Sequence, residues 1–231
     1  MSTFLELCGI VARESGAASS SSITSVTGNT GELEKIVSFT NDAWQYIQNK
    51  HESWQWMRTE FLSDAIIGTA RYTAASFSIT DWADWITDTP DFRTFSLYDP
   101  ALGVADEYAI THVDYNRWFA MYGRGSQTNS RPTYWAESPS GEFCLGAIPD
   151  LAYRVRGRYR QTNQVLAANG DTPNMPSRFH LLIAYHALVL MAGHDEAAQT
   201  YADNKAKARD LMFALERDQL PKMRMMGGTV A

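Results

Sequence analysis

The sequence has few cysteines and no long apolar run, and both shortages exclude whole classes of protein. Two cysteines among 231 residues are too few for a disulfide scaffold or a four-thiolate zinc site, and they indicate folding in a reducing cytoplasm. No apolar run reaches the roughly 18 residues that a membrane-spanning helix needs. Residues 1–14 have no basic leader before their apolar stretch, which argues against a secretory signal. The sequence therefore predicts a soluble globular protein.

Positive charge is also scarce, and lysine is absent from the middle of the chain. The 20 Lys and Arg residues against 26 Asp and Glu give a formal net charge of -6, which argues against a general nucleic-acid binder. Residues 65–176 contain arginine but no lysine, and arginine suits interfaces because it makes planar contacts with several donors. Seven tryptophans fit either partner surfaces or a tryptophan-rich core, and the sequence leaves both open.

Helical periodicity marks the N-terminal part of the chain. Thr3 and Glu6 have the spacing of a capping box in front of an apolar stripe, which predicts a first helix. A second helix is predicted over residues 30–51, where apolar residues recur at three- and four-residue spacing. Phe39 and Tyr46 lie on a flank of this stripe. Apolar residues off the core face suggest a second contact, with another element or another subunit.

Residues 173–221 return to helical periodicity. The stretch after Pro176 is apolar nearly all round, which predicts a helix at the buried centre of a bundle. A last helix carries one apolar stripe and an outward charged face, and Pro221 ends it. The tail beyond has no core pattern, and its methionines and basic side chains are candidate contacts with a partner that orders them. These candidates are Lys222, Met223, Arg224, Met225 and Met226.

The middle of the chain lacks the helical period and contains short runs typical of strands, such as residues 77–79, 92–98 and 143–145. The predicted fold class is therefore α+β, with an α-helical bundle made by the N- and C-terminal helices and an inserted antiparallel β-sheet or small barrel. The expected divisions are 1–53 for the N-terminal helices, 54–172 for the β-rich insertion, 173–221 for the C-terminal helices and 222–231 for an extended tail.

Residues that could carry chemistry do not form a motif. His180, His186 and His194 are six and eight residues apart, whereas two ligands on one helical face need three or four. Cys144 has no basic neighbour in the sequence, which indicates a structural thiol. The sequence has no glycine-rich phosphate loop, no HExxH and no nucleophile elbow. We expect no catalytic, cofactor-binding or metal residues and no enzymatic activity, although catalytic carboxylates can be distant in sequence.

The clearest local signal is a row of arginines within residues 153–160. Side chains of a strand alternate between its two faces, so Tyr153, Val155 and Tyr159 are expected to face the core. The opposite face then carries Arg154, Arg156, Arg158 and Arg160. Four like charges on one strand face repel each other unless anions lie opposite them.

Two sources of these anions stay open. The arginines could bind carboxylates of a neighbouring protein or DNA phosphate, and the acidic composition of the chain favours a protein. Alternatively, neighbouring strands of the same sheet could supply acids such as Glu107, Asp114 or Glu142.

Short sequence segments are spread over most of the chain, between the first predicted helix and the charged helix that contains Tyr201. They are TGNTGEL at 27–33, VSFTNDAWQYIQ at 37–48, WQWMR at 54–58, YRVR at 153–156 with Tyr159, Met175-Pro176 and Phe179-His180. In these segments and their order the chain resembles the head-to-tail adaptor, or connector, proteins of tailed bacteriophages. The resemblance includes no catalytic signature.

The resemblance implies a structural virion protein at the head–tail interface, assembled in the host cytoplasm, without a cofactor or an enzymatic step. Such adaptors form a dodecameric ring below the portal, extend the DNA channel and offer a platform to the tail. The implied partners are the portal protein, a tail or nozzle protein and further copies of the chain, with no membrane. DNA would pass through the lumen without specific binding, because an acidic wall repels phosphate.

Two other functions remain open. A tail-tube completion protein would bind a tail ring and ignore the portal. A soluble α+β enzyme or ligand-binding module would need a pocket on which titratable residues converge from separate segments, and it would stay monomeric beside portal rings.

Overall fold

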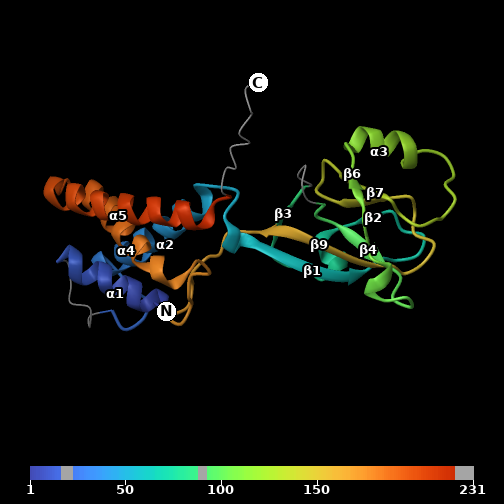
Figure 1. The fold of residues 1–231 in the computed structure, drawn as a ribbon. Helices are drawn as coiled ribbons and strands as arrows, with labels where there is room; N and C mark the ends of the chain where they lie inside the picture. Colours follow the sequence, from blue (N-terminus) through green and yellow to red (C-terminus); the bar gives the residue numbers. More distant parts are fainter. Residues whose placement is uncertain (17–22, 88–92, 222–231) are drawn as a thin grey trace, which may run out of the picture. The chain divides into compact units, whose positions relative to one another are not determined.

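A computed structural model describes residues 1–16, 23–87 and 93–221 and shows a mixed α+β chain with two compact units (Figure 1). The helical unit comprises Met1–Met57 and Asn163–Ala231, and the β unit comprises Arg58–Thr162. The predicted α+β class is confirmed. The units divide after residues 57 and 162, whereas the sequence analysis divides the chain after residues 53 and 172.

Four helices of the helical unit share one apolar core. They are α1 (Phe4–Ser15), α2 (Glu32–Asn49), α4 (His180–His194) and α5 (Ala198–Gln219). The short 3₁₀ turn η2 (Gln55–Met57) follows α2 and leads into β1 (Arg58–Asp64), and η5 (Ser177–Phe179) directly precedes α4. The helix α4 contacts α1, α2 and α5 (Figure 1), which accounts for apolar residues on nearly every side of it. The capping box of α1 is present, because the Glu6 amide donates to the Thr3 hydroxyl and the Thr3 amide donates to the Glu6 carboxylate.

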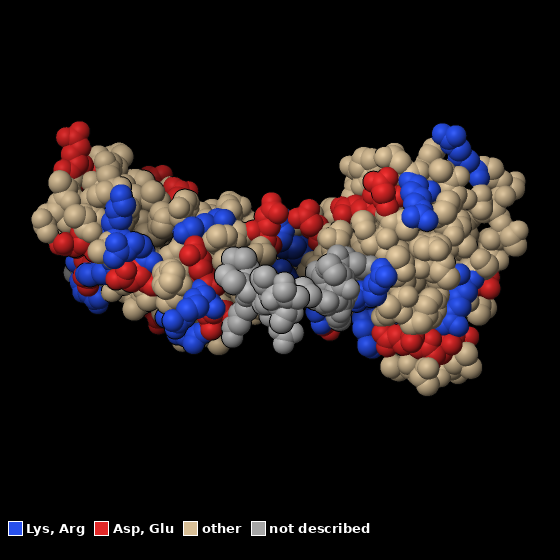
Figure 2. Space-filling model, turned by 45° about the horizontal axis from the view of Figure 1, so that its top comes forward, with Lys and Arg blue, Asp and Glu red and all other residues tan. Residues whose placement is uncertain are grey.

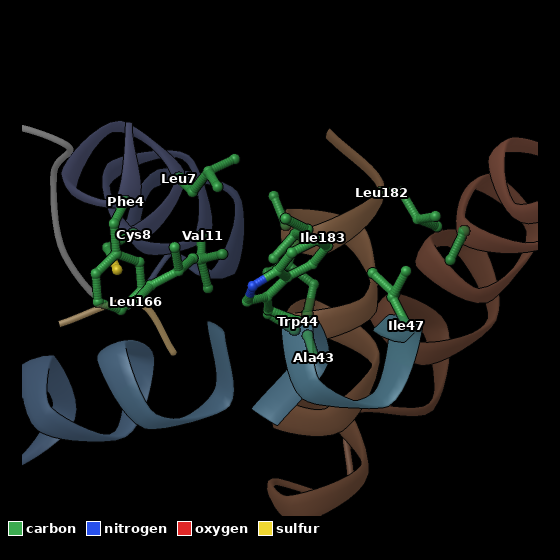
Figure 3. Close-up of a cluster of buried hydrophobic side chains, with 14 of the residues drawn as sticks. Phe4, Leu7, Cys8, Val11, Ala43, Trp44, Ile47, Leu166, Leu182 and Ile183 are labelled. Carbon is green, nitrogen blue, oxygen red and sulfur yellow. The ribbon is translucent and has the colours of Figure 1, made fainter. Parts of the chain in front are cut away.

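Side chains of α1, α2 and α4 point toward one another in the helical core, together with Leu166 (Figure 3). Trp44 and Trp54 have no exposed surface. The Trp54 indole N–H donates to the Ile47 carbonyl at 2.9 Å, and its ring stacks on Trp56. In the β unit, Trp118 and Trp135 are likewise buried. For these tryptophans, a role in the core is the correct explanation.

The β unit contains two open sheets within its described residues. The first has the strand order β1 (Arg58–Asp64), β9 (Arg154–Gln161), β4 (Ser96–Tyr98), β5 (Tyr108–Ala109), and β3 (Trp82–Trp85) also pairs with β9. The second has the order β2 (Arg71–Tyr72), β8 (Phe143–Gly146), β7 (Tyr134–Glu137), β6 (Thr111–His112). The prediction of one antiparallel sheet or small barrel is thus corrected to two sheets, in which β6 and β7 pair in parallel.

Both sheets contribute to one aromatic core in the β unit. The Phe95 ring lies 4.3 Å from that of Trp135 and 4.8 Å from that of Phe143. The predicted strand at residues 77–79 is wrong, because Phe77 ends the 3₁₀ turn η3 (Ala74–Phe77) and Ser78 is left-handed with φ 61°. Phe77 is nevertheless buried in this core, so its hydrophobicity reports burial and not strand geometry. The helix α3 (Tyr115–Tyr122) packs on β7 and β8.

Candidate interaction surfaces

The arginines of β9 occupy one face of the first sheet, as their spacing predicts. Tyr153, Val155 and Tyr159 are at most 6% exposed, because they point into the aromatic core. Gly157 lies on the same buried side, where Phe61 and Phe95 pack over its backbone. The arginine side chains on the other face are each partly exposed.

Each of these arginines has an acidic partner on a neighbouring segment of its own sheet. The distances between nitrogen and carboxylate oxygen run from 2.6 to 3.2 Å. The pairs are Arg154–Asp64 and Arg158–Glu60 across to β1, Arg160–Asp84 across to β3, and Arg156–Glu107 just before β5. The Arg154 guanidinium, through its hydrogen bonds, holds the pKa of the Asp64 carboxyl below its usual value.

The in-sheet pairs remove the electrostatic reason for an outside anion. Of the three acids suggested by the sequence, Glu107 does pair with the row. Asp114 instead caps α3 through the Asn116 amide, and Glu142 pairs with Arg71. Each arginine of this row is therefore ion-paired within its own sheet and stays partly accessible on its outer side. A contact of the arginine row with a neighbouring subunit stays a prediction.

Phe39 and Tyr46 lie on the flank of α2 that contacts α4, and they differ in exposure. Phe39 is half-buried, with its ring 5.9 Å from that of His194. Tyr46 is 50% exposed, and its ring lies 4.3 Å from that of His186. The structure thus shows intramolecular contacts for both residues, while half of Tyr46 remains available to a partner. The tail candidates at residues 222–226 lie outside the described residues.

Tyr46 forms one edge of a groove between α2, α4 and α5, which we call the basic groove. Its volume is ≈ 370 Å³. Apolar side chains of α4 and α5 line it together with three cationic ones. The lining residues are Tyr46, Lys50, His186, Val189, Leu190, Tyr201, Lys205, Ala208, Arg209 and Met212. Sequence reasoning missed this groove because its walls come from three helices that are distant along the chain.

Glu216 joins α5 to the end of α2 beside the basic groove. Its carboxylate lies 3.0 Å from the Lys50 ammonium and 2.9 Å from Nε2 of His51. Burial alone would raise the pKa of Glu216, but the hydrogen bonds from His51 and Lys50 outweigh it and lower the pKa. A carboxyl with a lowered pKa in the folded state stabilises the fold above its unfolded pKa of about 4.3, and this contribution is lost as the pH falls through the folded value.

We therefore expect Glu216→Gln to destabilise the helical unit at pH 7 by about 1 kcal/mol or less, because the ion pairs are partly exposed. The gap in free energy of unfolding between wild type and variant should shrink as the pH falls below about 4. Urea unfolding of both proteins between pH 7 and pH 3 measures this gap. A gap that is constant over this range would contradict an electrostatic origin.

The three histidines of the sequence analysis do not converge. His180 is buried, and its Nδ1 accepts from the Ser2 amide. The His186 ring packs against the Tyr46 ring in a tilted arrangement, and His194 pairs with Asp195. In the part of the chain that the structure describes, no group of three His, Cys, Asp or Glu side chains could hold a metal ion.

The cysteines are buried in separate units. Cys8 lies in the helical core and Cys144 lies beneath α3. Burial raises the pKa of each thiol to about 11. Both are therefore protonated at neutral pH and behave as small apolar core residues.

A loop between β4 and β5 carries exposed apolar residues that sequence periodicity does not reveal. It contains the 3₁₀ turn η4 (Val104–Asp106). Leu102 is 64% exposed and Val104 is 58% exposed. The signal that could have found them is a run of apolar residues without any period directly after the Asp99-Pro100 turn.

The sequence model of the SU10 adaptor protein family matches residues 2–230. The chain belongs to the SU10 adaptor protein family. No curated protein matches the sequence. The resemblance to phage head-to-tail adaptors is thereby confirmed on nearly the whole chain.

Membership of the family makes the chain a phage adaptor, a structural protein of the virion. Adaptors of this kind interact with portal and tail proteins. None of the described helices is both long enough and apolar enough to cross a membrane. The arginine row, the basic groove and the loop that carries Leu102 and Val104 are candidate surfaces for such protein contacts.

Proposed function

We propose that the chain forms a ring below the portal, extends the DNA channel and provides the platform to which the tail attaches. The observation that carries the proposal is the family match over residues 2–230. In this proposal α1, α2, α4 and α5 act as one helical bundle, and the partners are the portal, a tail or nozzle protein and further copies in a ring of twelve. The protein assembles in the host cytoplasm and has no enzymatic step.

The distribution of charge supports passage of DNA without specific binding. The net charge is -6, and the arginines of β9 are engaged by carboxylates of their own sheet. On the face shown in Figure 2, acidic and basic side chains are interspersed and form no continuous basic field. Phosphate contacts need clustered, available Lys and Arg, so a lumen lined by this protein would let DNA slide.

Native mass spectrometry of the protein, alone and mixed with the portal ring of its own genome, tests the proposal. The expected result is a portal ring that gains the mass of several copies of the chain, even if the free protein is a monomer. A portal ring without added mass would overturn the proposal. In that case, the same measurement with a tail ring would test the function in tail-tube completion.

The same assay tests whether the outer side of the arginine row of β9 forms a contact between subunits. We expect Arg154→Gln with Arg158→Gln to leave the fold intact, because exposed ion pairs contribute only about 0–1 kcal/mol each. If the arginine row binds a neighbouring subunit, fewer copies of this variant than of the wild-type chain add to the portal ring. Arg13→Gln is the matched control, since Arg13 forms an exposed ion pair on α1. If the double variant adds the same mass to the portal ring as wild type does, the arginine row is not part of the contact between subunits.

A further inference from the structure

The basic groove combines an apolar floor with a cationic rim. Val189, Leu190 and Met212 supply apolar surface between α4 and α5. Phe213 follows on the exposed side of α5, where it is 66% exposed. Solvent-exposed aromatic and aliphatic side chains around a concave surface are typical of a docking site.

The charged residues that line the basic groove all carry positive charge. Lys50 and Arg209 have acidic neighbours outside the lining, at Glu216 and Asp210. The Lys205 ammonium lies 5.0 Å above the Tyr201 ring, and it donates to the Tyr201 hydroxyl at 3.3 Å. An occupant that suits this groove is apolar at its tip and acidic at its base.

The β unit presents a segment of this composition. Residues 99–107 read DPALGVADE, with three acids and no basic residue. Ala101, Leu102, Val104 and Ala105 are all exposed. We call residues 101–105 the exposed loop.

The base of the exposed loop is held rigidly. The Asp106 carboxylate accepts hydrogen bonds from the Asp99 amide and from the Arg131 guanidinium. The Asp99 carboxylate accepts from the Ala101 amide at 2.8 Å. Because these bonds fix the loop before any contact forms, docking loses little conformational entropy.

We propose that the exposed loop of one copy docks into the basic groove of a second copy. Leu102 and Val104 fill the apolar floor, and the Asp99 carboxylate at the base of the loop approaches Lys205. Asp106 and Glu107 keep their ion pairs with Arg131 and Arg156. The two surfaces are different patches of the same chain, so the contact is head-to-tail, and repetition of such a contact closes a ring when the rotation permits. The inference rests on the proposed ring and names the surfaces that join its subunits.

Disulfide crosslinking tests the contact directly. A chain with Ala101→Cys and Arg209→Cys places one thiol on each proposed surface and keeps Leu102, Val104 and Lys205, and both cysteine positions are exposed. The native thiols do not compete because Cys8 and Cys144 are buried. The expected result, on the portal ring or in the free protein, is a ladder of covalent multimers that a reductant collapses to monomer.

The matched control is Ala101→Cys with Lys207→Cys, which keeps Leu102 and Val104. Lys207 is also an exposed cationic residue of α5, but its ammonium lies over the Tyr185 ring and it does not line the basic groove. We expect this control to add to portal rings as wild type does and to form far less multimer. A second variant, Leu102→Asp with Val104→Asp, keeps exposed positions exposed and should abolish the contact without unfolding the β unit.

The outcomes separate this inference from the proposed function. Portal rings that gain several copies without covalent multimers specific to Arg209→Cys would overturn the docking contact and leave the adaptor function standing. The same holds if Leu102→Asp with Val104→Asp assembles as wild type does. No added mass on the portal and no ladder in the free protein would overturn both. A ladder in the free protein without portal binding would support the contact and contradict the adaptor function.

Discussion

Replacing Gly157 with valine should destabilise the β unit by about 3 kcal/mol, at the upper part of the usual range for overpacked cores. A Cβ atom at this position would lie 2.2 Å from the Phe95 ring and 2.9 Å from the Phe61 ring. Neither ring can withdraw easily, because Phe95 also packs against Trp135 and Phe143. Urea unfolding, followed by near-UV circular dichroism of the aromatic core, measures the loss.

A graded series identifies the clash as the cause. Gly157→Ala should cost less than valine, and Gly170→Ala is the control because a Cβ there meets nothing within 4 Å. In the Gly157→Ala background, Phe95→Leu should cost less than it does in wild type, since the smaller side chain makes room for the added methyl group. Equal costs of Phe95→Leu in both backgrounds would contradict the steric explanation.

Gly157 occupies a buried position of β9, between Arg156 and Arg158, whose side chains lie on the opposite face. Alternation along a strand is a local property, so the sequence alone indicates which side chains of β9 face the core. The glycine interrupts the buried side at the point where two phenylalanines need the space. The sequence alone does not reveal why position 157 is a glycine, because Phe61 and Phe95, whose rings pack on it, lie in segments distant from β9.

Three of the four partners of the arginines, Asp64, Glu60 and Asp84, were not predicted, for a related reason. They depend on which strands flank β9, and the chain brings β1 and β3 to it from residues 58–64 and 82–85. Glu60 and Asp84 are separated from their arginines by 98 and 76 positions. Of the three acids that the sequence suggested, Glu107 pairs with Arg156. The fold uses the other two, Asp114 and Glu142, to cap α3 and to pair Arg71.

Features that depend on residues close together in the sequence were predicted correctly. The capping box at Thr3 and Glu6 forms because its two hydrogen bonds join residues within one turn. The apolar helix α4 is central because it has no polar face to give to water. By contrast, the basic groove depends on three helices and the exposed loop on the pairing of β4 with β5, so neither has a local signature.

Replacing Trp44 with alanine should destabilise the helical unit by about 3–5 kcal/mol, as large-to-small changes of buried aromatic residues do. Trp44 has no exposed surface and lies among side chains of α1, α2 and α4 (Figure 3). The surrounding helices cannot collapse fully into the space, so the loss includes a cavity as well as the transfer of the ring. Chemical denaturation followed by far-UV circular dichroism, which reports on the helices, measures this loss.

Trp44→Phe separates packing from hydrogen bonding. The indole N–H of Trp44 is buried and finds no acceptor among the described residues, so phenylalanine loses volume but removes an unsatisfied donor. We expect Trp44→Phe to cost much less than Trp44→Ala. If the two variants lose equal stability, the indole N–H has a partner that matters to the fold. Because the basic groove is built on the same helices, Trp44→Ala should also weaken docking, whereas Trp44→Phe should preserve it.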